Sequence, residues 1–98
     1  MNPPAFSKEL GVNTTDFYRF LHKIASEEEY TEKGNCITIP LKNSGRVEIH
    51  HSEEKSRVLS PLIQIPYMEV QIYFFDVSMP EQELFLTNFK WAFHRGGG

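Results

Sequence analysis

The chain has 98 residues, a formal net charge of −3 and a single cysteine. Its length corresponds to one domain, and its 40% apolar and 13% aromatic content is enough to build a hydrophobic core. One cysteine excludes an internal disulfide, so this core must stabilise the folded state. The negative charge, with basic residues scattered singly along the chain, is not typical of a nucleic-acid-binding protein.

The amino-terminal segment lacks the charged head and apolar run of a secretory signal. No apolar stretch approaches the ~20 residues that a membrane-spanning helix needs. We therefore expect a cytoplasmic protein that does not bind a membrane. Its expected partner is another protein or a second copy of itself, and not a nucleic acid.

Residues 1–13 are expected to form an irregular lead-in, because Pro3 and Pro4 discourage an early helix. The remaining residues, 14–98, are expected to form a single α+β domain. Its first element is a helix over about 15–28. The apolar residues of this helix follow the i, i+3, i+4, i+7 spacing of one helical face, namely Phe17, Phe20, Leu21 and Ile24.

A β-hairpin is expected next, because apolar and polar residues alternate over 37–41 and 46–51. The loop over 43–45 ends in a glycine, and three-residue hairpin loops of one common type end in a left-handed residue. This loop predicts that Ile39 pairs with Ile49. The apolar residues of both strands then share one face of the sheet.

Two strands and a helix complete the expected order of elements. A short, kinked strand is predicted over 57–65 and a longer one over 67–77, in which Tyr73 and Phe75 lie on a second apolar face. A serine–glutamate capping box and a helical apolar spacing predict the last helix over 79–94.

This order predicts an α+β fold with a small antiparallel sheet of three to four strands. The N-terminal and C-terminal helices are expected to pack on one face of that sheet. The predicted core consists of Phe20, Ile24, Ile39, Ile49, Val70, Ile72, Phe85 and Phe89.

Cys36 and His50 are the candidate nucleophile and base. In the expected register Cys36 faces Ser52, and His50 is its diagonal neighbour, roughly 7–8 Å away. No Asp or Asn is obviously placed to orient the histidine. No metal site is expected, because His50 and His51 are adjacent in a strand and point to opposite faces. No cofactor is expected either, since the chain has no glycine-rich phosphate loop and no paired-cysteine motif.

The chain ends in Arg-Gly-Gly-Gly over 95–98, which is similar to the diglycine tail of ubiquitin-like carriers. Those carriers begin with a hairpin and end in a strand before the tail. Here a helix is expected first, and another helix is expected to precede the glycines. We therefore interpret the glycines as the C-cap of the last helix.

Four large apolar side chains are left outside the predicted core: Tyr73, Phe75, Leu84 and Trp91. Tryptophan is enriched at the energetic centres of protein interfaces. We therefore expect a small non-enzymatic protein-interaction or adaptor module, with a homodimer as one form. The alternative is a small-molecule-binding domain, or a small enzyme that uses Cys36 and His50.

Overall fold

The computed structural model of the chain describes residues 3–94. In chain order the elements are β1 (Phe6–Leu10), α1 (Thr14–Leu21), β2 (Thr31–Lys33), β3 (Cys36–Pro40), β4 (Arg46–His51), β5 (Lys55–Ser60), β6 (Ile63–Phe75) and α2 (Met79–His94). The strands are antiparallel and follow the order β1-β6-β4-β3-β2, with β5 paired to β6 outside this row. Neither described helix is long and apolar enough to cross a membrane.

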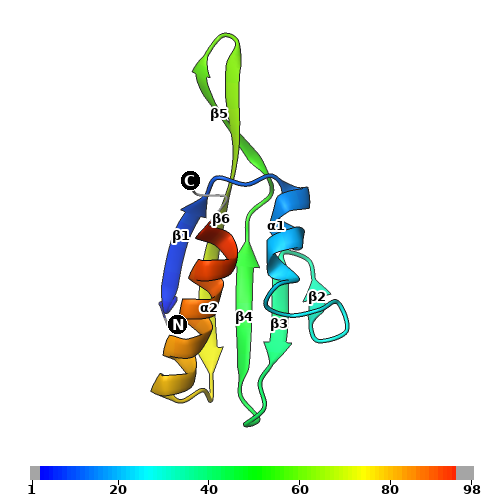
Figure 1. Ribbon diagram of the computed structural model, residues 1–98, viewed down its shortest axis with the longest axis vertical. Coiled ribbons are helices and arrows are strands. Elements are labelled where there is room, and N and C mark those ends of the chain that lie inside the picture. Colours follow the sequence, from blue (N-terminus) through cyan, green and yellow to red (C-terminus); the bar gives the residue numbers. More distant parts are fainter. Residues whose placement is uncertain (1–2, 95–98) are drawn as a thin grey trace.

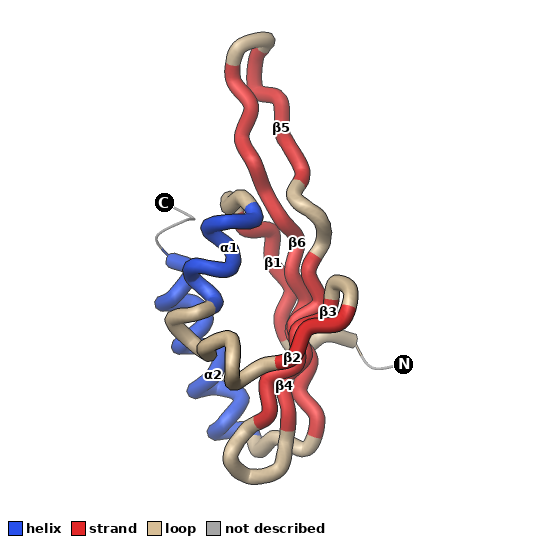
Figure 2. The backbone as a smooth tube through the Cα atoms, turned by 90° about the vertical axis from the view of Figure 1, so that its right-hand side faces the viewer, coloured by secondary structure: helices blue, strands red, loops and turns tan. Residues whose placement is uncertain are grey.

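The molecule has two layers, with both helices on the same side of the sheet (Figure 2). The core forms between them, where the central strands β3, β4 and β6 contribute the fully buried side chains of Ile37, Ile49 and Ile72. The helices contribute an aromatic layer, in which the Phe17 ring of α1 lies 5.7 Å from the Phe93 ring of α2. The opposite face of the sheet carries no helix among the described residues.

The fold class is α+β with an antiparallel sheet, but the sheet has six strands and not the expected three or four. One additional strand, β1, lies within residues 1–13, which were expected to be irregular. It pairs with β6, with Phe6 opposite Ile72. Lys8 occupies the central position on its inward face, so the segment shows no apolar alternation that would indicate a strand. The first helix is therefore preceded by a strand.

Helix α1 ends at Leu21 and not near residue 28. The N–H groups of Lys23 and Ile24 donate to carbonyls three residues earlier, at 3.0 and 2.9 Å, and these tight turns end the helix. The three glutamates at 27–29 would be unfavourable at a helix C-terminus. Ile24 is consequently only half-buried, whereas the other predicted core residues are buried: Phe20, Ile39, Ile49, Val70, Ile72, Phe85 and Phe89.

The hairpin of β3 and β4 has a different register from the expected one. Ile39 lies opposite Val47 and not opposite Ile49. The loop is correspondingly longer, and its residue at positive φ is Ser44, at 66°, and not Gly45. Because the shift is two residues, the apolar side chains remain on one face, and alternation alone does not distinguish the two registers.

Strands β5 and β6 form a hairpin that projects beyond the helices (Figure 1). We call this hairpin the arm and define it as residues 55–67. Pro61 lies in its turn, so the single kinked strand expected over 57–65 is in fact two strands with a tight connection. The arm extends the molecule to 49 Å along its longest axis, against 29 and 25 Å along the others.

Candidate functional site

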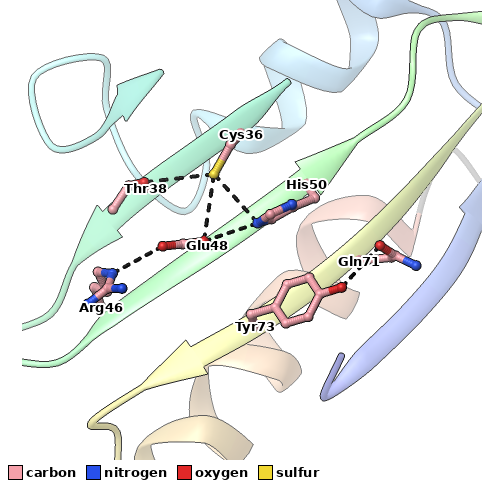
Figure 3. A network of polar contacts seen from close by, with 7 residues as sticks. All are labelled: Cys36, Thr38, Arg46, Glu48, His50, Gln71 and Tyr73. Carbon is pink, nitrogen blue, oxygen red and sulfur yellow. Dashed lines mark hydrogen bonds and ion pairs between the residues drawn. The ribbon is translucent and has the colours of Figure 1, made fainter. Parts of the chain in front are cut away.

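The sheet face opposite the helices carries a polar cluster formed by Cys36, Glu48 and His50 (Figure 3). Cys36 in β3 lies directly opposite His50 in β4, and Glu48 precedes His50 by two residues, so all three side chains share one face. The Cys36 Sγ atom lies 3.6 Å from His50 Nε2 and 3.9 Å from Glu48 Oε1. The His50 Nε2 and Glu48 Oε1 atoms are 3.1 Å apart. Sulfur, nitrogen and oxygen atoms therefore converge on one point.

Two residues flank the cluster on the same face. The Nε group of Arg46 donates to Glu48 Oε2 at 3.1 Å, and the Tyr73 ring lies 4.8 Å from the His50 ring. The Arg46 guanidinium also lies 4.2 Å from the centre of the Phe75 ring. Tyr73 and Phe75, two of the predicted binding residues, are thus half-buried by neighbours on their own sheet face.

The environment shifts the pKa values of two members of the cluster. The hydrogen bond from His50, supported by Arg46, lowers the pKa of Glu48 below its usual value. Burial raises the pKa of the Cys36 thiol, and the neighbouring Glu48 carboxylate adds to this effect. Near neutral pH the cluster therefore contains a carboxylate beside a neutral thiol.

This geometry does not favour an activated cysteine nucleophile. In a triad, the histidine uses one nitrogen for the nucleophile and the other for the orienting carboxylate. Here Cys36 and Glu48 face the same nitrogen of His50. A nitrogen that donates to a carboxylate has no lone pair left to accept the thiol proton. The raised pKa of Cys36 also opposes formation of the thiolate.

Glu48 is the member of the cluster that sequence reasoning missed. The expected register placed Ser52 opposite Cys36, whereas the structure places His50 there. The signal that could have found Glu48 is its two-residue spacing from His50, because both side chains then lie on the sheet face that Cys36 shares in either register.

The other described histidines lie apart from this cluster. His51 points to the opposite face, as expected, and its ring lies 5.0 Å from the ring of Phe17. Its side chain is only 8% exposed. The Nε2 atom of His22 lies 2.9 Å from the hydroxyl oxygen of Tyr30, and His94 lies at the end of α2. The structure therefore does not bring His22 and His94 to the cluster.

The arm is a second candidate site, because it exposes large apolar side chains outside the core. These residues are Val58, Leu59, Leu62, Ile63 and Ile65. Leu62, at the turn, is 95% exposed. Positions 58–66 carry no charged residue, whereas Lys55 and Arg57, at the base of the arm, form ion pairs with Glu69 and Glu9. The sequence reasoning missed this surface because it treated 57–65 as one strand.

The remaining two predicted binding residues, Leu84 and Trp91, are exposed on α2. Trp91 is 75% exposed, and the seven-residue spacing places both side chains on one side of the helix. The amino-terminal segment does not cover them, because it forms β1 at the edge of the sheet. A depression of about 430 Å³ next to Leu84 is also lined by Ile39 and Phe85.

A larger depression, of about 560 Å³, lies on the sheet face opposite the helices. Its lining is mostly polar and includes Ser7, Glu9, His50, Glu69 and Gln71. Small-molecule sites are typically lined by apolar and aromatic side chains with a few polar groups. This depression is therefore a weaker candidate for a small-molecule site than the arm is for a protein contact.

Comparison with known protein families, with curated proteins and with solved structures finds no match to this chain. The two features of the molecule that bear on its function are therefore the cluster on the open sheet face and the arm. These two sites differ in chemistry, because one is polar and half-buried and the other is apolar and exposed.

Proposed function

We propose that this chain is a small, non-enzymatic protein-interaction module that forms a homodimer through the arm. The observation that carries this proposal is the set of exposed apolar side chains on a hairpin that projects from the body. Each large apolar side chain left in water forgoes about 1.5–3 kcal/mol of burial energy. Apolar patches of this kind mark interaction surfaces in soluble proteins.

The chemistry of the arm favours a second copy of the chain as the partner. In a two-fold symmetric interface the same patch meets itself, so a charged patch would place like charges together. Positions 58–66 carry no charge, and the centres of interfaces are depleted in charged residues. The arm is therefore compatible with a contact to its own copy.

The open backbone edges of the arm also favour a second copy of the chain as its partner. Among the described residues, β5 pairs with β6 alone, so its outer edge is open. The pairing of β1 with β6 ends at Leu10 opposite Met68, which leaves the second edge of the arm open as well. Open strand edges pair readily with other strands. Two arms that join edge to edge would satisfy these backbone groups and bring their apolar side chains into contact across the seam.

We assign a smaller role to the predicted binding residues outside the arm. Leu84 and Trp91 form a secondary surface on α2, and Tyr73 and Phe75 contribute little because they are half-buried. We place the module in the cytoplasm, since its single cysteine leaves it without an internal disulfide.

The test compares the oligomeric state of the wild type with that of two double variants by analytical ultracentrifugation. We expect a concentration-dependent dimer for the wild type and a monomer for Leu62→Glu with Ile65→Glu. The control is Leu84→Glu with Trp91→Glu, which adds the same charge on α2 and should remain dimeric. Circular dichroism checks that each variant is folded.

Two results would contradict the proposal. If the wild type is monomeric throughout the micromolar range, the chain does not self-associate and the proposed dimer is wrong. If the α2 variant is monomeric and the arm variant remains dimeric, the dimer interface contains Leu84 and Trp91 and not the arm. Binding to lipid vesicles by a monomeric wild type, but not by the arm variant, would instead identify the arm as a membrane contact.

A further inference from the structure

We propose that Cys36, Glu48 and His50 form a binding site for a Zn²⁺ ion on the open sheet face. This site is independent of the arm and of the proposed dimer. It uses one thiolate, one carboxylate oxygen and one imidazole nitrogen, which are the three kinds of side-chain ligand that zinc takes in proteins. No other group of three such residues with converging ligand atoms occurs among residues 3–94.

The distances within the cluster match those between ligands of one tetrahedral ion. Zinc bonds of about 2.3 Å to sulfur and about 2.0–2.2 Å to nitrogen and oxygen give ligand separations of roughly 3.3–3.6 Å. The observed separations are 3.6 Å for Sγ to Nε2, 3.9 Å for Sγ to Oε1 and 3.1 Å for Oε1 to Nε2. Each differs from its tetrahedral value by no more than about 0.4 Å.

Hydrogen bonding alone explains this convergence poorly. The Cys36 thiol has one proton, yet its sulfur faces Glu48, His50 and the Thr38 hydroxyl at 3.6–4.0 Å (Figure 3). None of these contacts is a short bond. A cation at the point between the three ligand atoms would replace the thiol proton and neutralise the thiolate and the carboxylate together.

Neighbouring residues hold the ligands in place. The bond from Arg46 to Glu48 Oε2 leaves Oε1 facing Cys36 and His50. The Tyr73 ring packs against the imidazole of His50 and limits its rotation. Such supporting contacts orient metal ligands and tune their affinity.

The other groups that face the site set its charge. Arg46 forms an ion pair with Glu48, and Lys33 of β2 lies opposite Cys36 in the backbone register. The side chain of His50 is 44% exposed, so the site opens to solvent. Three protein ligands with an open fourth position are the arrangement of a zinc site that keeps a water or an external ligand.

The first experiment titrates the reduced chain with Co²⁺, a spectroscopic substitute for Zn²⁺, and then displaces it with Zn²⁺. We expect one ion per chain, the visible absorption bands of tetrahedral Co²⁺ and a thiolate charge-transfer band in the ultraviolet. Zn²⁺ should also slow alkylation of Cys36 by iodoacetamide. Protection from alkylation needs no variant, so this measurement does not depend on how a substitution affects folding.

The second experiment uses matched variants. His50→Ala and Glu48→Gln should each weaken binding at least about tenfold, as loss of a supporting or ligating group does at metal sites. Cys36→Ser should abolish the charge-transfer band. The controls are His94→Ala and Glu53→Gln, which make the same changes at exposed positions outside the cluster and should bind as the wild type does.

Several results would overturn the proposal. They are the absence of saturable binding to the wild type, an octahedral Co²⁺ spectrum, or alkylation of Cys36 that Zn²⁺ does not slow. Equal affinity of His50→Ala and His94→Ala in folded protein would also overturn it. These outcomes are independent of the oligomeric state, which tests the proposed dimer separately.

Discussion

Strand β6 passes through two environments, and its two halves can be compared directly. In the body, Met68, Val70 and Ile72 alternate along one face and are at most 1% exposed. In the arm, Ile63 and Ile65 are also two residues apart, but their odd positions place them on the opposite face of the strand, and they are 53% and 42% exposed. The residue types and the two-residue spacing are similar, so the difference lies in which face of the strand the side chains share and in what covers that face.

The lengths of β6 and of the two helices explain where helix coverage of the strand ends. The 13 residues of β6 span about 43 Å at ~3.3 Å per residue. The 16 residues of α2 span about 24 Å at 1.5 Å per residue, and α1 has 8 residues and is about half as long. Neither helix can cover the whole of β6. The comparison teaches that a strand's periodicity indicates which side chains share a face, whereas the position and length of the helices decide which face is buried and over how much of the strand.

The largest expected effect is on the stability of the covered half. Phe89 of α2 is 1% exposed and its ring lies 4.4 Å from the ring of Phe93. Phe89→Ala should lower the free energy of unfolding by about 3–5 kcal/mol, because it leaves a cavity in the core. Leu62→Ala, at the tip of the arm, should change it by no more than about 0.5 kcal/mol in the monomer. Urea denaturation at low protein concentration measures both, and similar losses would contradict the contrast.

The same substitution within β6 sharpens the comparison. Ile72→Ala should cost about 2–5 kcal/mol of unfolding free energy, since Ile72 is fully buried. Ile65→Ala should cost less than about 1 kcal/mol in the monomer, because its side chain is already largely hydrated. Both values come from urea denaturation. An Ile65→Ala loss as large as that of Ile72→Ala would show that the arm is part of the core.

A smaller loss is expected at the far end of β6, where the backbone is tightly packed. A Cβ atom on Gly45 would lie 2.3 Å from the carbonyl oxygen of Asp76 and 2.8 Å from a methyl carbon of Val77. Gly45→Ala should therefore destabilise the fold by about 1–3 kcal/mol through overpacking. Ser60→Ala in the arm is the control and should be nearly neutral. Thermal unfolding followed by circular dichroism compares the two, and an unchanged midpoint for Gly45→Ala would contradict the close contact.

The smallest effect concerns pH. The bonds from His50 and Arg46 hold the pKa of Glu48 below its ordinary value of 4.5, so this carboxylate stabilises the fold above that pH. The contribution is lost as the pH falls through the lowered pKa. Because the cluster is partly hydrated, Glu48→Gln should cost less than about 1 kcal/mol near neutral pH. The difference from the wild type should disappear in acid.

A variant in the arm, Leu62→Ala, is the control for this pH effect. Positions 58–66 contain no titratable side chain, so the difference between the wild type and Leu62→Ala should not change over the same acid range. Urea denaturation at several pH values measures both differences. A Glu48→Gln difference that grows as the pH falls would contradict the sign of the pKa shift.

The local parts of this fold could be predicted from the sequence. Capping residues and helical spacing gave the bounds 79–94, which are those of α2. The same kind of reasoning missed β1 and β2, because both are short edge strands with charged residues. The pairing of β1 also depends on the distant backbone of β6, whereas β2 pairs with the neighbouring β3. The sequence does not predict the arm, because Pro61 within an apolar segment indicates a kinked strand as readily as a turn between two strands.

The candidate site was only partly predictable for a related reason. Cys36 and His50 were both identified, but their distance depended on the register of β3 and β4. A two-residue shift keeps every apolar side chain on the same face, so the hydrophobic pattern carries no information about it. That shift places His50 opposite Cys36 and adds Glu48 to the cluster.

The central position of β6 has a consequence for synthesis of the chain. β1 is made first, yet it lies at the edge of the sheet and pairs only with β6 among the described strands. During translation β1 therefore has no partner until β6 has left the ribosome. Pairing between segments so distant in sequence is slow because a long loop must close first. Until β1 docks, one edge of nascent β6 is open, and refolding at high chain concentration should favour aggregation over the native sheet.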